Sequence, residues 1–172
     1  MSFLAFFSHI NMRILGLETS CDETSVAIIE TDGKDFKVEK NLTASQAAKH
    51  AEYGGVVPEV AARCHVDVVF PLLEAVGVPR DGAGIDAIAV TAGPGLVPAL
   101  RIGVEAAKTL ALSWNKPLVA VNHMEGHVLS VLLPDSTTPP LHHSINFPAV
   151  CLLVSGGHTE LLLMKNFASL NF

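Results

Sequence analysis

The chain has 172 residues, of which 49% are hydrophobic and 16% are charged, and its net charge is −6. This length and composition exclude a largely disordered chain and predict one packed domain with, at most, the beginning of another. The acidic balance excludes binding of nucleic acid through bulk positive charge, so such a partner would need a local basic patch or another subunit. Three widely spaced cysteines indicate neither a disulfide framework nor a zinc pair, which favours a reducing compartment.

Residues 1–11 are apolar at their centre and contain no Lys or Arg. This apolar run is too short for the core of a signal peptide or for a membrane span, so no membrane role is expected. Met12 stands directly before the first predicted strand. Residues 1–11 are therefore either an extra N-terminal tail or a stretch upstream of the true start.

A strand–turn–strand pattern occurs twice in the chain. Apolar segments flank a polar turn at residues 19–24, and others flank a polar turn at residues 155–159. Repeated supersecondary units indicate a duplicated architecture. Because both turns are rich in small polar residues, the pattern predicts two phosphate-facing loops, one in each of two lobes.

Strand and helix patterns alternate between the two hairpins. The predicted elements are, in chain order, an edge strand at 36–42, a helix from Pro58 that Pro71 should kink or divide, a buried strand at 85–90, a helix at 98–114, a buried strand at 118–121 and a helix at 124–132. Such alternation predicts parallel strands with both faces of the sheet covered.

This order of elements is that of the first lobe of an actin-like or sugar-kinase-like α/β fold. We expect residues 12–133 to form this lobe and residues 134–146 to be a connecting loop. Residues 147–172 would then begin a second, similar lobe.

The sharpest local motif is His123-Met-Glu-Gly-His127. Histidines four residues apart share one face of a helix, and two neutral imidazoles so placed can hold Zn²⁺ or Fe²⁺. A third ligand would have to come from elsewhere. The other interpretation is a pair of polar residues at the start of a helix. The position directly after a predicted buried strand favours the metal site, because ligands gather at such strand ends.

The motif differs from the metallopeptidase signature His-Glu-x-x-His. In that signature the glutamate directly follows the first histidine and reaches the metal-bound water. Here Met124 holds that position and Glu125 follows it. A shift of one residue rotates a helical side chain by about 100°. Peptidase chemistry is therefore disfavoured.

The two polar turns carry the other candidate site residues. The glycines of the Ser155-Gly156-Gly157 turn allow close approach of a ligand, and its N–H groups could form an anion-binding nest. An ordinary hairpin turn is the alternative. Asp22 and Glu23 could bind a cation, act as a general base or orient a substrate amine. The alternative for these two residues is a solvated acidic turn.

Taken together, these motifs resemble the TsaD/Gcp family, the tRNA adenosine threonylcarbamoyltransferases. The matching stretches are residues 12–24, 53–59, 91–97, 123–127 and 153–159. They cover nearly the whole chain from Met12 onward and are specific in combination. A non-catalytic relative, TsaB, shares the fold but lacks the two-histidine motif, so the resemblance is to the catalytic member.

The resemblance implies an actin-like (ASKHA) fold and a cytoplasmic enzyme of tRNA modification. Such an enzyme transfers the threonylcarbamoyl group from threonylcarbamoyl-AMP to the exocyclic amine of an adenosine. That adenosine lies beside the anticodon in tRNAs that read codons beginning with A. The expected partners are tRNA and two further subunits, one TsaB-like and one TsaE-like.

The resemblance also assigns site residues by matching positions. His123 and His127 would bind one divalent metal ion, Fe²⁺ or Zn²⁺, and Asp22 and Glu23 would lie beside the reacting carbonyl. The acyl-adenylate would be bound by Leu153, Val154, Ser155, Gly156 and Gly157.

The chain departs from the family in length. Family members are longer, and their second lobe supplies a third metal ligand, an aspartate. We therefore expect this chain to be an incomplete form that is inactive in isolation. The alternatives are a non-catalytic half-enzyme or scaffold subunit of the same complex, a metallopeptidase, and a sugar-kinase relative inferred from the fold alone.

Overall fold

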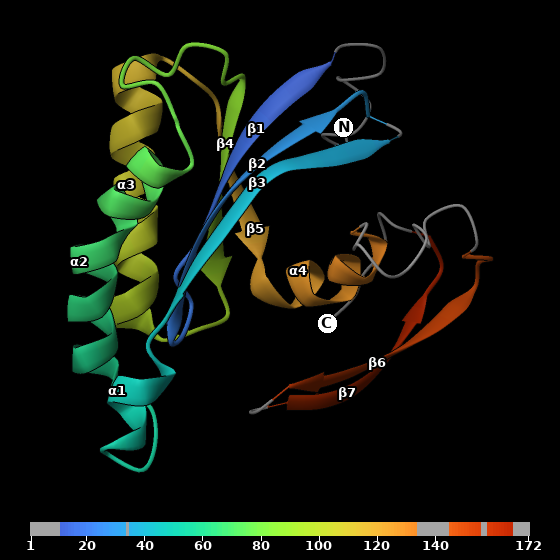
Figure 1. Ribbon diagram of the computed structural model, residues 1–172. Coiled ribbons are helices and arrows are strands. Elements are labelled where there is room, and N and C mark those ends of the chain that lie inside the picture. Colours follow the sequence, from blue (N-terminus) through green and yellow to red (C-terminus); the bar gives the residue numbers. More distant parts are fainter. Residues whose placement is uncertain (1–10, 34, 134–144, 156–157, 167–172) are drawn as a thin grey trace. The chain divides into compact units, whose positions relative to one another are not determined.

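The computed structural model describes residues 11–33, 35–133, 145–155 and 158–166 (Figure 1). The chain divides into two compact units, Met1–His123 and Met124–Phe172. The predicted tail and most of the predicted connector lie outside the described residues, and the lobe boundaries stay a prediction. In the described part of the chain, no helix has the length and apolar character that a membrane span requires.

The first unit is built on a five-stranded sheet with the strand order β3-β2-β1-β4-β5. Its strands are β1 (Met12–Glu18), β2 (Glu23–Thr31), β3 (Phe36–Ser45), β4 (Ala87–Gly93) and β5 (Leu118–Asn122). Strands β1, β2 and β3 pair antiparallel, whereas β1–β4 and β4–β5 pair parallel. The two predicted hairpin strands and the edge strand are thus confirmed.

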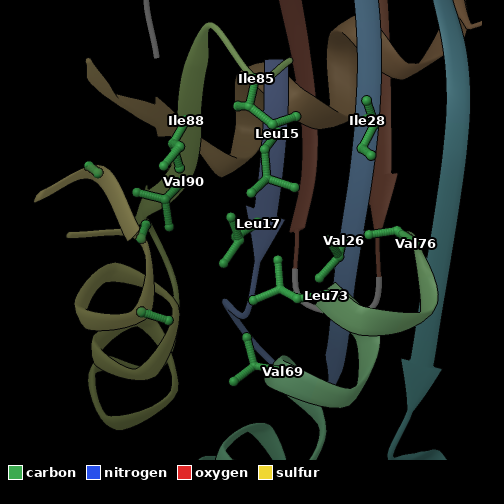
Figure 2. Close-up of a cluster of buried hydrophobic side chains, with 13 residues drawn as sticks. Leu15, Leu17, Val26, Ile28, Val69, Leu73, Val76, Ile85, Ile88 and Val90 are labelled. Atoms are coloured by element: carbon green, nitrogen blue, oxygen red, sulfur yellow. The ribbon is translucent and has the colours of Figure 1, made fainter. Parts of the chain in front are cut away.

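Three helices accompany this sheet, namely α1 (Ala47–Ala51), α2 (Pro58–Ala75) and α3 (Val97–Trp114). The two long helices lie on the same face of the sheet (Figure 1). Alternation along the strands turns Leu15, Leu17, Val26 and Ile28 toward this face, where they are fully or almost fully buried. Figure 2 shows these side chains meeting those of α2.

Three details of the first unit differ from the sequence-based expectations. The sheet is mixed, because the front hairpin pairs antiparallel with the parallel half. Strand β5 was expected to be buried but is only partly so, since it is an edge of the sheet. Pro71 does not divide α2. The backbone carbonyl that its missing N–H leaves without a helical partner belongs to Asp67, which is an exposed residue.

The second unit contains a short helix and a hairpin. Helix α4 (His123–Leu129) is followed by the 3₁₀ turn η2 (Ser130–Leu132), and β6 (Ala149–Ser155) pairs antiparallel with β7 (His158–Met164). The second predicted hairpin is therefore confirmed. Its small core consists of Met124, Val128, Leu153, Leu162 and Met164.

Candidate functional site

The candidate site of the first unit lies where three parallel strands end. Strands β1, β4 and β5 are neighbours in the sheet and run in the same direction. Their carboxyl ends therefore share one edge, which is where ligand sites of open α/β sheets lie. Glu18 is the last residue of β1, Thr91 lies near the end of β4, and His123 directly follows β5.

A carboxylate and a hydroxyl hold the ring of His123. Its Nδ1 lies 3.3 Å from Oε2 of Glu18 and 3.1 Å from Oγ of Ser20. The other carboxylate oxygen of Glu18 accepts a hydrogen bond from the Ser20 amide at 2.5 Å. The three residues thus form one hydrogen-bonded group at the sheet edge.

The protonation state of Glu18 fixes the tautomer of His123. Burial raises the pKa of Glu18, but hydrogen bonds from His123, Ser20 and Thr91 outweigh it and lower the pKa to about 2. Glu18 is therefore ionised at neutral pH, and an ionised carboxylate only accepts hydrogen bonds. The proton of a neutral His123 then sits on Nδ1, so Nε2 carries the lone pair.

The turn after β1 is anchored to helix α3 by Thr19, whose side chain is fully buried. Its hydroxyl donates to the carbonyl of Ala99 at 3.0 Å and accepts from the amide of Gly103 at 3.2 Å. These two backbone groups are normal partners in a helix, so the hydroxyl bridges them. A Cβ on Gly103 would collide with this hydroxyl. The absence of a side chain at residue 103 is thus what lets the turn approach.

Ser20 ties the same turn to the beginning of α3. The amide of Leu96 donates to the Ser20 carbonyl at 2.7 Å. A Cβ on Gly95 would lie 2.6 Å from that oxygen, so only glycine permits this approach. Gly95, which lies just beyond the end of β4, therefore serves close packing against the turn.

The predicted carboxylates lie next along the turn. Asp22 is half-buried, and Glu23 is exposed and begins β2. Burial, and then the neighbouring Asp22, raise the pKa of the Cys21 thiol. A raised pKa disfavours the reactive thiolate, so Cys21 is not set up as a nucleophile.

The predicted metal ligands both lie on α4, His123 at its first position and His127 at its fifth. Metal-binding histidines usually donate their other ring N–H to a carboxylate, and the contact of His123 with Glu18 has this form. No cluster of three or more His, Cys, Asp or Glu side chains that could hold a metal occurs among the described residues. The donor set found here is thus compatible with a metal ion but is incomplete.

The predicted acyl-adenylate segment lies at the end of β6. Leu153 is buried, Val154 is exposed, and Ser155 pairs with His158 at the end of the strand. Gly156 and Gly157 lie outside the described residues.

Sequence reasoning placed Thr19 and Ser20 in a candidate polar turn but gave neither a role, and it did not identify Glu18 or Thr91 as site residues. Glu18 could have been noticed, because it is a charged residue at the end of a buried strand and directly before a polar turn. No local pattern indicates that it contacts a histidine 105 positions away.

The family model and the curated relatives that match this chain agree on one family. The family model of TsaD, described as tRNA N6-adenosine threonylcarbamoyltransferase, matches residues 37–171. A protein of that name from Thermomicrobium roseum is 50% identical over 159 residues, which are 90% of this chain and 42% of the relative. Another from Sphingopyxis alaskensis is 51% identical and covers 88% of this chain and 42% of the relative. The chain thus spans less than half the length of these relatives.

Solved structures bear on the fold alone. A Ppx/GppA family member from Aquifex aeolicus matches with a TM-score of 0.51 and 14% sequence identity, over 95% of this chain and 50% of that one. This likeness confirms the actin-like α/β fold class that the sequence predicts.

Proposed function

Because the chain belongs to the TsaD family of tRNA N6-adenosine threonylcarbamoyltransferases, we propose that it is part of an enzyme that performs this transfer. The substrates would be threonylcarbamoyl-AMP and the adenosine beside the anticodon in tRNAs that read codons beginning with A. The geometry that supports the proposal best is the Glu18–His123 contact at the carboxyl edge of the sheet. A carboxylate partner of this kind is usual for a histidine that binds a metal ion.

His123 and His127 would hold one divalent metal ion, Fe²⁺ or Zn²⁺, together with a ligand from beyond the described residues. When bound, such an ion supplies a Lewis acid that polarises a carbonyl group. Glu18 and Ser20 would keep the His123 ring in the orientation that the ion requires.

In the proposed reaction the exocyclic amine attacks the carbonyl carbon of the threonylcarbamoyl group. The bond from that carbon to the phosphate oxygen breaks, and AMP leaves. Asp22 or Glu23 would take the proton that the amine loses. Backbone N–H groups of residues 153–157, with Ser155, Gly156 and Gly157 at the turn, would stabilise the charge on the leaving phosphate.

The further proposals concern assembly and location. Family membership supports partner subunits that are similar to TsaB and TsaE. It also supports a cytoplasmic site of action. Because the chain carries a net charge of −6, such partners would also help to supply the positive charge that tRNA binding needs. We further propose that the hairpin of β6 and β7 begins the second lobe.

The test uses the gene product isolated from its source cells, incubated with threonylcarbamoyl-AMP and tRNA. Digestion of the tRNA and mass spectrometry of the nucleosides should reveal threonylcarbamoyladenosine. The variant His123→Ala should lose both bound metal and transfer. Retention of both in this variant would refute the assignment of His123. Chelator-sensitive peptide cleavage without transfer would instead establish the metallopeptidase alternative.

A further inference from the structure

A network of buried polar side chains packs against the turn of residues 19–24. The proposed reaction assigns this polar network no role. Its members are Thr24, Gln46, His50 and His65, each no more than 5% exposed. Burying a polar side chain is costly unless it is hydrogen-bonded, and each of these four has a partner within the group. These hydrogen bonds fix both the position of each side chain and the direction in which it donates.

The first link joins His65, on α2, to the backbone of the turn. Its Nε2 lies 3.1 Å from the carbonyl oxygen of Cys21, and a carbonyl only accepts, so Nε2 carries the proton. Its Nδ1 is then an acceptor, 2.7 Å from the hydroxyl of Thr24. Burial lowers the pKa of His65, which keeps the ring neutral, as this pattern requires.

The remaining links fix the orientation of that ring. Nδ1 of His65 also accepts from the side-chain amide of Gln46 at 3.3 Å, and the Gln46 oxygen accepts from Nε2 of His50 at 3.2 Å. Nδ1 of His50 accepts in turn from the amide of Val57 at 3.4 Å. The hydrogen bonds therefore run in one direction, from the residue before α2 to the Cys21 carbonyl.

Gln46 makes a second connection to the turn through its own backbone. Its amide donates to the carbonyl of Asp22 at 2.9 Å. The carbonyls of Cys21 and Asp22 therefore accept hydrogen bonds from the polar network. Thr19 and Ser20 are instead bonded to backbone groups at the beginning of α3. The turn is fixed from two sides.

We propose that His65, oriented by Gln46 and His50, is a positioning residue that holds the backbone of residues 21–23 in the conformation required for transfer. Through this backbone it sets where the carboxylates of Asp22 and Glu23 point. The proposal rests on the function proposed above. A purely structural role is the competing explanation, and it predicts that activity follows stability and nothing else.

The test compares three variants of the full gene product. His65→Leu removes both hydrogen bonds of the ring, whereas His65→Gln retains a donor toward the Cys21 carbonyl. Val69→Ala is the matched control, because Val69 is also buried on α2 but packs in the apolar core. Steady-state transfer kinetics are measured with tRNA as the varied substrate, and stability is measured by denaturant unfolding.

We expect His65→Leu to lower kcat by about tenfold to a hundredfold with little change in KM, because a misplacement of ~1 Å can have that effect. His65→Gln should recover most of kcat. Val69→Ala should keep kcat even where its loss of stability is similar. If kcat of His65→Leu is unchanged, or if it falls only in proportion to stability in all three variants, the positioning role is wrong.

A second measurement does not depend on transfer activity. Nitrogen-15 NMR of the wild-type imidazole should show the Nε2-protonated tautomer of His65. Amide hydrogen exchange at residues 21–24 should be faster by about tenfold or more in His65→Leu, equivalent to at least ~1.4 kcal/mol of local stability. Unchanged exchange would overturn the proposal. A wild-type protein without transfer activity but with this exchange response would instead overturn the proposed function.

Discussion

Glu18 is the residue on which the orientation of His123 depends. Its carboxylate accepts from Nδ1 of His123 at 3.3 Å. Replacing the carboxylate by an amide, in Glu18→Gln, removes the charge that favours this tautomer. We expect the affinity of the gene product for Zn²⁺ or Fe²⁺ to fall by about 10- to 100-fold, the usual effect of changing such a partner. Competition with a chromogenic chelator measures this affinity.

Glu39→Gln is the control for the loss of a carboxylate. Glu39 pairs with Arg13 at 2.7 Å, and Arg13 is close to the opposite end of β1 from Glu18. Its removal should leave metal affinity unchanged. Equal losses in the two variants would show that the effect of Glu18→Gln comes from net charge and not from the contact with His123.

The packing of Gly95 against Ser20 gives a prediction about stability. A methyl group at Gly95 would lie 2.6 Å from a backbone oxygen, which cannot move without shifting the turn. Gly95→Ala should therefore lower the free energy of unfolding by about 1–3 kcal/mol, as overpacking usually does. Gly55→Ala is the matched control, because no atom lies within 4 Å of the added methyl. Urea denaturation of both variants checks the difference, and equal stabilities would contradict the packing explanation.

The buried ring of His65 makes stability depend on pH. Burial lowers the pKa of His65 below its ordinary value of 6.5 in the folded protein. As the pH falls below about 6.5, the unfolded chain binds a proton that the folded protein does not, so the free energy of unfolding decreases. The slope from this residue cannot exceed ~1.4 kcal/mol per pH unit. Denaturation series from pH 7.5 to 5.5 should show a shallower decrease in His65→Gln, and an identical slope in that variant would contradict this account.

At the scale of whole elements, the helix α2 owes its position to one apolar face. Leu73 lies on that face in the main core, whereas Leu112 on α3 is 85% exposed. Leu73→Ala should lower the free energy of unfolding by about 2–5 kcal/mol, because it leaves a cavity. Leu112→Ala should change it by less than about 0.5 kcal/mol. Thermal and urea unfolding of the two variants provide the comparison. A similar loss of unfolding free energy in both variants would contradict the role of Leu73 in the main core.

The elements predicted best from the sequence are those whose hydrophobic pattern depends only on neighbouring residues. Both hairpins and helix α3 were expected close to their observed bounds, because alternation and helical spacing are properties of neighbouring residues. The edge position of β5 depends on the order of strands in the sheet, which local pattern does not contain. The continuity of α2 through Pro71 depends on the surroundings of Asp67, the exposed residue whose carbonyl loses its helical partner, and local pattern does not contain these either.

The site was predictable as a set of residue types but not as a set of contacts. His123 was expected to be a ligand, yet its partner Glu18 was not identified. His50 and His65 have no ligand spacing in the sequence, and His65 lies 41 positions from Thr24, to which it bonds. Such pairings arise only once the sheet and α2 have brought distant segments together.

At the scale of the whole molecule, the hairpin of β6 and β7 is apolar on both faces. One face packs on α4 within the second unit. The other face carries five large apolar side chains that are 60–70% exposed, namely Val150, Leu152, Val154, Leu161 and Leu163. Strands with two apolar faces are typical of sheets that are covered on both sides. This pattern supports the proposal that the hairpin begins a second lobe.

An exposed apolar face of this kind should make the 172-residue chain self-associate when it is produced by itself. Leu152 and Leu161 are directly opposite each other in the register. The double variant Leu152→Lys, Leu161→Glu replaces them by an opposite-charge pair, which cross-strand geometry tolerates. Sedimentation velocity over a range of concentrations should show a smaller associated fraction for this variant than for the wild type. Leu112→Lys, which changes an exposed leucine of α3, should leave association unchanged. An equal reduction in both variants would mean that general surface polarity, and not the hairpin face, controls association.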